Sequence, residues 1–198
     1  MPVRTRRQRA ADAAIEVIAE QGMRGLTHRA VDARAALPPG SASSCFRTRL
    51  ALLDGVVDRM RELDEATIVR IPPHAWHNRE RATAALVGLL EHWLGPARTR
   101  TRARMELYLD AAAYAMLRAD LDAASEVFLR MAADGMRAAG VPGAGDAARM
   151  LVAQLDGVLF DALVRPAPAD GGAWVRYAAE TIMRSVPLTD RERERGPG

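Results

Sequence analysis

Lysine is absent from this 198-residue chain, and all 28 basic residues are arginines. The chain has a single cysteine, Cys45, which excludes an intrachain disulfide and fits a reducing compartment. Its longest uncharged, mainly apolar helical stretch is residues 82–90, far shorter than the ~20 residues that a membrane-spanning helix requires. No apolar segment follows the basic N-terminus, so no secretory signal is visible. We therefore expect a cytoplasmic protein that makes no membrane contact.

Aromatic residues are also scarce, at 5% of the chain, whereas hydrophobic residues make up 49%. That apolar fraction argues against disorder, and the length allows one large core or two small ones. Abundant Ala, Leu, Arg and Glu with few β-branched residues favour helix. The one strand-like run, residues 99–104, would have no partner strand. The composition predicts an all-α fold.

Positive charge is concentrated at the N-terminus. Residues 1–50 hold nine arginines and four acidic residues, a net charge of +5, whereas the remaining 148 residues carry a net charge of −2. A basic segment on a nearly neutral body indicates binding to an anionic polymer such as DNA. The alternative is a helical cap with a solvated arginine-rich surface.

Three short helical segments are expected within this basic quarter. Residues Ala11, Ala14, Ile15 and Ile18 form an apolar stripe, and Gly22 is a suitable C-terminal stop. Thr27 is a suitable N-cap for a second helix over residues 28–34. A third helix can begin at Pro39, with Phe46 as its apolar anchor. Two short helices joined by a turn of about four residues predict a helix-turn-helix.

Six longer helices are expected after this head, for about nine in total. A connecting helix over residues 49–71 ends at two prolines, and residues 72–79 are expected to form a loop. The apolar periodicity then predicts helices over residues 81–94, 98–117, 120–139, 146–163 and 174–186. This pattern divides the chain into a helix-turn-helix head at 1–48, a larger helical domain at 49–188 and a disordered tail at 189–198.

The N-terminal quarter resembles the TetR family of bacterial transcriptional regulators. The residues that carry the resemblance are Ala14, Ile15, Gly22, Leu26, Thr27, Val31, Arg34, Ala35, Gly40, Ser41, Phe46, Leu52 and Leu53. The chain departs from the family pattern at Ala36, where glycine is usual, and at Pro38, where a serine usually caps the recognition helix. It departs again at Ser43, Ser44 and Cys45, which replace an aromatic pair and a histidine.

The resemblance implies a ligand-responsive regulator, most simply a repressor, that binds a palindromic double-stranded operator as a homodimer. One helix-turn-helix from each subunit would dock in successive major grooves. Arginines of the head would supply attraction to the phosphates. The expected DNA-binding residues are Arg4, Arg6, Arg7, Thr27, His28, Arg29, Pro39, Gly40, Ser41, Ser43, Ser44, Arg47 and Arg49.

The resemblance also implies a small organic effector bound among the central helices. The expected pocket residues are Trp93, Met105, Tyr108, Met116, Phe128, Met131, Asp156 and Phe160. Such Met and aromatic residues are more often plain core, but Asp156 lies on an apolar stripe, where a carboxylate needs a partner from an effector or another subunit. The last two helices would form the dimer interface through Leu151, Leu155, Val158, Ala162, Val175, Ala178 and Ile182.

Catalytic and metal-binding motifs are not visible. The pair His74 and His77 has no cysteine companion and only Glu80 nearby, whereas a zinc site usually needs three or four ligands. No nucleophile elbow, phosphate-binding loop or dinucleotide-binding turn occurs. We expect no metal, no cofactor and no enzyme activity. The alternative function is a helical small-molecule-binding or scaffold protein with a degenerate head, because Ser43, Ser44 and Cys45 depart from the family pattern.

Overall fold

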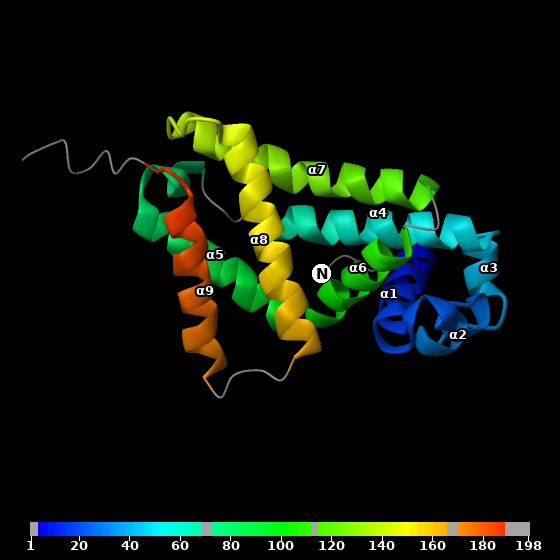
Figure 1. Cartoon of the computed structure of the whole chain (residues 1–198). Helices are drawn as coiled ribbons and strands as arrows, with labels where there is room; N and C mark the ends of the chain where they lie inside the picture. The colour runs from blue at the N-terminus through cyan, green and yellow to red at the C-terminus, as the bar shows by residue number, and fades with distance from the viewer. Residues whose placement is uncertain (1–3, 69–72, 112–114, 166–169, 189–198) are drawn as a thin grey trace, which may run out of the picture. The chain divides into compact units, whose positions relative to one another are not determined.

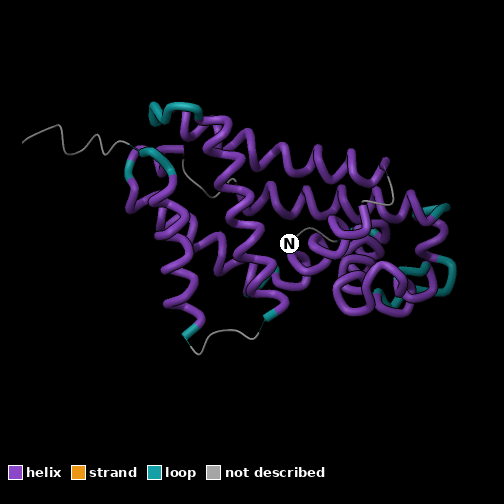
Figure 2. Tube along the Cα trace, viewed as in Figure 1, coloured by secondary structure: helices purple, strands orange, loops and turns teal. Residues whose placement is uncertain are grey.

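The computed structural model describes residues 4–68, 73–111, 115–165 and 170–188. Within these ranges the chain forms nine α-helices and one 3-10 helix, and no strand is present (Figures 1 and 2). The predicted all-α fold class is therefore confirmed. The predicted disordered tail, 189–198, lies outside the described residues.

Contacts between Cα atoms divide the chain into two compact units. Unit 1 comprises Met1–Ala66 and Arg98–Ala124, and unit 2 comprises Thr67–Ala97 and Ser125–Gly198. Most of the helix that follows the head thus packs within unit 1. The expected functional boundary at residue 48 stays a prediction, and the packing boundaries lie elsewhere in the chain.

The first helix of unit 1, α1 (Arg6–Gly25), begins with a reciprocal cap. The amide of Gln8 donates to the Thr5 hydroxyl at 3.1 Å, and the amide of Thr5 donates to Gln8 Oε1 at 3.0 Å. The stripe predicted from Ala11 to Ile18 is buried. Gly22 has a φ of 66°, so the backbone leaves helical geometry at the predicted stop, and a further short helical segment continues as far as Gly25.

The helix-turn-helix consists of α2 (His28–Arg34) and α3 (Ser41–Cys45). The Thr27 cap on α2 is confirmed, because its hydroxyl accepts from the Ala30 amide at 3.1 Å. The predicted start of α3 at Pro39 is wrong by two residues. Gly40 has a φ of 85°, which is outside the helical region, so helical geometry begins only at Ser41.

Unit 1 is completed by α4 (Arg49–Ile68, as far as residue 66), α6 (Arg98–Asp110) and the start of α7 (Ala115–Ala138). The predicted helix boundary between residues 117 and 120 is wrong, because α7 runs through this region without interruption. The break falls between α6 and α7 instead. Neither glycine nor proline occurs from 111 to 120, so no local signal marks the position of the break.

Unit 2 contains η1 (Pro73–His77), α5 (Arg79–Leu94), α8 (Ala144–Val164), α9 (Gly171–Ser185) and the remainder of α7. The expected loop over 72–79 instead includes η1, where Ala75 and Trp76 are buried. The side chains of Asn78 and Asp170 cap α5 and α9, which begin two and three residues earlier than predicted. None of the described helices is long and apolar enough to cross a bilayer.

Candidate functional site

The turn of the helix-turn-helix is held by a buried carboxylate. Asp32, on α2, is 6% exposed and accepts from two backbone amides at the start of α3. Gly40 N donates to Oδ2 at 2.8 Å, and Ala42 N donates to Oδ1 at 2.7 Å. No residue at the N-terminus of α3 caps it with its own side chain. Asp32 therefore takes the place of the serine cap that Pro38 cannot provide.

The same turn carries a conformation that side chains rarely adopt. Ala36 has a φ of 49°, and it is the only described residue other than glycine with a positive φ. A Cβ atom makes this left-handed region costly, which explains why glycine is usual at such turns. The Leu37 amide donates to the Asp32 carbonyl at 3.0 Å and so helps to hold the turn.

Several residues predicted to contact DNA are engaged inside the head. Arg7 lies 4.3 Å over the Phe46 ring and donates to the Cys45 carbonyl at 2.9 Å. Arg49 donates to the carbonyls of Met23 and Leu26, which follow the kink in α1. His28 Nε2 lies 2.7 Å from the Phe46 carbonyl oxygen. These three side chains hold the ends of α1 and α3 in place.

Other predicted DNA-binding residues face solvent. Arg6, Arg29 and Arg47 are exposed, as are Pro39 and Gly40. Ser43 and Ser44 are exposed on α3, and both hydroxyls donate to the Gly40 carbonyl, at 3.0 and 2.8 Å. Ser41, in contrast, is buried at 7% exposure. The outer surface of α3 therefore presents small hydroxyl side chains, and the exposed Arg6, Arg29 and Arg47 belong to the same three-helix head.

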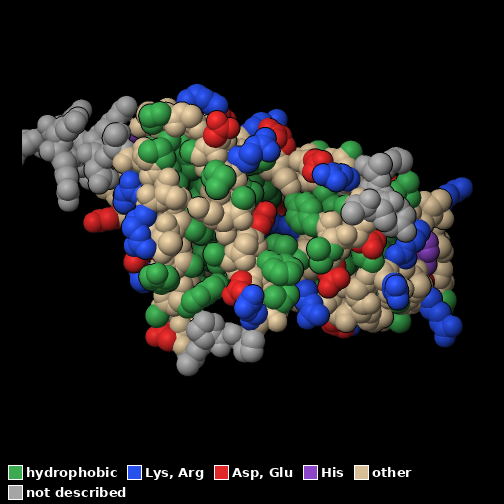
Figure 3. All heavy atoms as spheres, in the orientation of Figure 1, with side chains coloured by type: hydrophobic (Ala, Val, Ile, Leu, Met, Phe, Trp, Pro, Cys, Tyr) green, Lys and Arg blue, Asp and Glu red, His purple; other side chains and the backbone are tan. Residues whose placement is uncertain are grey.

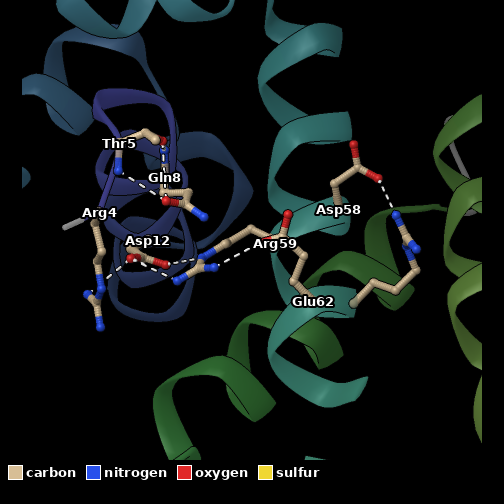
Figure 4. A network of polar contacts seen from close by, with 8 residues as sticks. Arg4, Thr5, Gln8, Asp12, Asp58, Arg59 and Glu62 are labelled. Carbon is tan, nitrogen blue, oxygen red and sulfur yellow. Dashed lines mark hydrogen bonds and ion pairs between the residues drawn. The ribbon is translucent and has the colours of Figure 1, made fainter. Parts of the chain in front are cut away.

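A charged network joins α1 to α4 (Figure 4). Asp12 accepts from Arg59 Nε at 2.7 Å and pairs with Arg4 at 3.1 Å, so Arg4 is held by an acidic partner although it is 65% exposed. Arg59 also donates to Glu62 at 2.8 Å. The hydrogen bond to Asp12 raises the pKa of Arg59, so this guanidinium stays charged.

A second and more deeply buried cluster joins α4 to α6. Asp64 accepts from Arg104 Nη2 at 2.8 Å and pairs with Arg100 Nε at 3.0 Å, and all three side chains are at most 12% exposed. Burial lowers the pKa of Arg100, and the attraction of Asp64 opposes that change. One carboxylate thus compensates two buried guanidinium groups, so its removal would leave both poorly solvated.

Unit 2 contains a small apolar cavity of about 40 Å³. Trp93 and Phe128 meet edge to face along its wall, with ring centroids 5.7 Å apart and an interplanar angle of 66°. The lining residues come from η1, α5, α7 and α8 and are Ala75, Trp76, Ala82, Ala85, Leu86, Leu89, Trp93, Phe128, Met131, Ala132, Leu151, Val152 and Leu155. Every one of these side chains is uncharged.

Three predicted pocket residues, Trp93, Phe128 and Met131, are brought together in this cavity. The other five do not line it. Met105 and Tyr108 lie on α6 in unit 1, Asp156 is half-buried on α8, and Phe160 is 45% exposed. The side chain of Met116 lies outside the described residues. Sequence reasoning missed Trp76, because residues 72–79 carry loop signals and no helical periodicity.

A groove of about 410 Å³ lies between α8 and α9, where hydrophobic side chains reach the surface (Figure 3). Val158, Ala178 and Ile182 of the predicted dimer interface line it, together with Trp174 and Tyr177, which sequence reasoning missed. Leu151, Leu155 and Val175 are buried within the chain itself, and Ala162 is half-buried. Tyr177 is 64% exposed, so this groove carries a large apolar side chain in contact with solvent.

The described residues include no cluster of three or more histidine, cysteine or acidic side chains able to hold a metal ion. The His74 side chain lies outside what the structure describes, so the expectation for the His74 and His77 pair stays a prediction.

Comparison with known proteins identifies the family. Residues 77–187 match the family described as "Tetracyclin repressor-like, C-terminal domain". The crystal structure of the multidrug binding protein EbrR with imidazole is 30% identical, with a TM-score of 0.71, and the alignment covers 96% of this chain and 99% of that one. A TetR family member from Streptomyces coelicolor A3 is 31% identical, with a TM-score of 0.74 and coverage of 93% and 100%.

A transcriptional regulator from Rhodococcus sp. Rha1 is 21% identical, with a TM-score of 0.76 and coverage of 92% and 96%, and supports the fold alone. Among curated protein sequences, none matches the chain. The family match covers more than half of the chain, and two of these solved relatives share at least 30% of its residues. The chain therefore belongs to the TetR family and is a ligand-responsive transcriptional regulator.

Proposed function

We propose that this protein is a repressor that binds a palindromic operator as a homodimer and leaves it when a small organic effector binds in unit 2. The observation that carries the proposal is the head itself, a helix-turn-helix fixed by Asp32 with exposed arginines around it. A regulator of this kind acts in the cytoplasm, where bacterial DNA lies.

We assign contacts to DNA according to the exposure of each side chain and the hydrogen bonds that it makes within the head. Arg6, Arg29 and Arg47 are exposed and belong to the head, so we assign phosphate contacts to them first. Arg7 and Arg49 are positioned by carbonyl groups of the head, and we assign them mainly to holding its shape. Ser43 and Ser44 would face the bases, because a hydroxyl can rotate from the Gly40 carbonyl to a base edge.

Dimerisation is assigned to the exposed faces of α8 and α9. Tyr177 and Val158 belong to the groove between these helices, where a second copy would remove apolar surface from water. Replacing Tyr177, which is largely exposed, with aspartate should give folded monomers by light scattering. The same change at Ile182 would damage the fold of the subunit, because that side chain is only 5% exposed within the chain.

The effector is assigned to the apolar cavity beside Trp93, Phe128 and Met131. EbrR, which is similar to this chain, has been crystallised with ethidium, with malachite green and with proflavin. Binding in this chain would favour one of two conformations of the dimer, and release of DNA requires that the effector binds the two with different affinity.

The test of DNA binding is a gel shift with the DNA upstream of the protein's own gene, over 50–200 mM salt. Each phosphate contact contributes about −0.9 to the slope of log affinity against log salt. Replacing Arg6, Arg29 and Arg47 together with alanine should make the slope shallower by about two to three per subunit. The matched control replaces the exposed Arg81, Arg130 and Arg137 on α5 and α7 of unit 2, which removes the same charge and should leave the slope unchanged.

The second candidate function is a small-molecule-binding protein whose head no longer reads DNA, and the small side chains at Ser43 and Ser44 motivate it. A wild-type slope near zero would contradict the repressor proposal and favour this candidate. An equally shallow slope in the two triple variants would show that binding depends on the net charge and not on a particular surface.

A further inference from the structure

The cavity of unit 2 has a uniform chemistry. Its thirteen lining residues are alanine, valine, leucine, methionine, phenylalanine and tryptophan. Neither an acidic nor a basic side chain is among them, and Asp156, the carboxylate expected there, is not either. A bound cation would lose its water and gain no counter-charge from this wall.

Aromatic faces offset that cost only in part. Attraction between a cation and an aromatic ring is weaker than the cost of burying an unpaired charge. An uncharged apolar molecule loses little on leaving water and gains dispersion contacts with every wall of the cavity. The lining therefore discriminates by charge before it discriminates by shape.

The cavity is too small for an aromatic ligand as it stands. Its free space of about 40 Å³ compares with the about 10–15 Å³ that one water molecule needs on the same kind of measure. Apolar cavities that hold benzene are about 150 Å³. At least one wall must therefore move before the cavity can enclose a whole ring.

Trp76 belongs to the shortest of the elements that line the cavity. It lies on the five-residue η1, whereas the lining residues from 82 to 155 belong to the long helices α5, α7 and α8. Its indole rests directly on Gly135 of α7, where an added Cβ would lie 2.1 Å from Trp76 Cδ1. The absence of a side chain at position 135 is thus what lets the indole close the cavity.

We propose that the effector cavity binds an uncharged aromatic molecule, which enters by displacing the Trp76 indole from its position against Gly135. The inference rests on the proposed function in one respect, because it takes this cavity to be the effector site. Trp76 acts here as a size-determining residue, and the lining sets the charge preference.

Charge is tested with two probes of nearly the same shape. 1-Methylnaphthalene and N-methylquinolinium differ by one ring atom and one positive charge. Isothermal titration calorimetry on the full-length protein should give an affinity at least about tenfold higher for 1-methylnaphthalene, corresponding to about 1.4 kcal/mol. Equal or tighter binding of N-methylquinolinium would overturn the charge preference.

The role of Trp76 is tested with three variants. Trp76→Ala should bind 1-methylnaphthalene at least about tenfold more tightly than the wild type, because no indole has to be displaced. Gly135→Ala should also bind it more tightly, and its tryptophan emission should be red-shifted before ligand is added, since the new methyl group excludes the indole. Tyr108→Ala is the control, because Tyr108 lies on α6 in unit 1 and does not line the cavity.

Unchanged affinity in both Trp76→Ala and Gly135→Ala would overturn the role of Trp76, and circular dichroism checks that each variant is folded. No binding of either probe to the wild type or to Trp76→Ala would overturn the whole inference. The gel shift separates these failures from failure of the proposed function. If the protein binds DNA but neither probe binds, this inference fails and the repressor proposal stands. The same holds if a probe releases DNA without entering the cavity.

Discussion

The two units of the molecule are stabilised by different interactions. Among the described residues, all five buried polar or charged side chains lie in unit 1: Asp32, Ser41, Asp64, Thr101 and Arg104. The buried side chains described in unit 2 are apolar, and they surround a cavity. Arg79 forms a long-range polar link within unit 2, donating from α5 to the carbonyls of Met183, Val186 and Leu188.

The polar interior of unit 1 and the apolar interior of unit 2 suit different functions. Buried hydrogen bonds and ion pairs are directional, so they specify one arrangement and penalise departures from it. A helix-turn-helix must present its residues in a fixed geometry, and Asp32 contributes to that. Apolar contacts have no preferred direction, so unit 2 can repack around a ligand at lower cost.

The largest expected effect is at Asp64. Replacing it with alanine leaves Arg100 and Arg104 buried without their shared carboxylate, and we expect a loss of about 3–5 kcal/mol in the free energy of unfolding. Urea unfolding followed by circular dichroism measures this loss. A loss below about 1 kcal/mol would show that water reaches the two guanidinium groups and that the cluster does not stabilise unit 1.

A smaller effect is expected at Asp32. Asp32→Ala leaves the Gly40 and Ala42 amides without their acceptor, at a cost of about 1–3 kcal/mol. Operator affinity should fall with it, because α3 loses its cap. Asp32→Asn keeps one acceptor oxygen and should recover part of both losses. If Asp32→Ala binds DNA as the wild type does, the hydrogen bonds to Asp32 do not position α3.

The turn between α2 and α3 offers a gain in stability. Ala36→Gly relieves the left-handed backbone at φ 49°, and we expect a gain of about 0.5–1 kcal/mol after the greater freedom of glycine in the unfolded chain is counted. The urea midpoint should rise. The matched control is Ala33→Gly within α2, which should lower stability by about 1 kcal/mol. A lower urea midpoint in both variants would show that the backbone at Ala36 is not strained.

The smallest effect is expected for a charge pair in unit 2. Arg165 pairs with Asp161 at 2.7 Å, but the two side chains are 75% and 47% exposed. Arg165→Ala should therefore change the free energy of unfolding by no more than about 0.5 kcal/mol, and added salt should remove even that. A change comparable to that of Asp64→Ala would remove the contrast between the units.

Local signals in the sequence predict much of this fold. The apolar stripe from Ala11 to Ile18 and the cap at Thr27 predict α1 and α2, because both depend on residues a few positions apart. The break between α6 and α7 could not be found, because alanines there favour helix on either side. The early starts of α5 and α9 follow from Asn78 and Asp170, two capping residues that the same rules could have identified.

The candidate site was less predictable, because its parts depend on contacts between distant residues. An apolar stripe on α8 predicts burial but does not say what covers it, and Leu151 and Leu155 prove to be covered by their own chain. Trp76 lies in a segment with loop signals and reaches the cavity only through contact with α7. In the sequence, nothing distinguishes Asp32 from an ordinary charged residue on a short helix. Its contact with the amides of α3 becomes visible only in the folded structure.

Gly55 has a consequence for how this protein can evolve. An added Cβ at this position in the middle of α4 would lie 2.2 Å from Phe46 Cε1, and Phe46 directly follows α3. Glycine costs a helix about 1 kcal/mol relative to alanine, so random drift would readily replace it on an open surface. Here every replacement displaces the Phe46 ring, which directly follows α3. A library of all substitutions selected for repression should therefore retain glycine at position 55, while its neighbour Asp58, exposed on the same helix, accepts many residues.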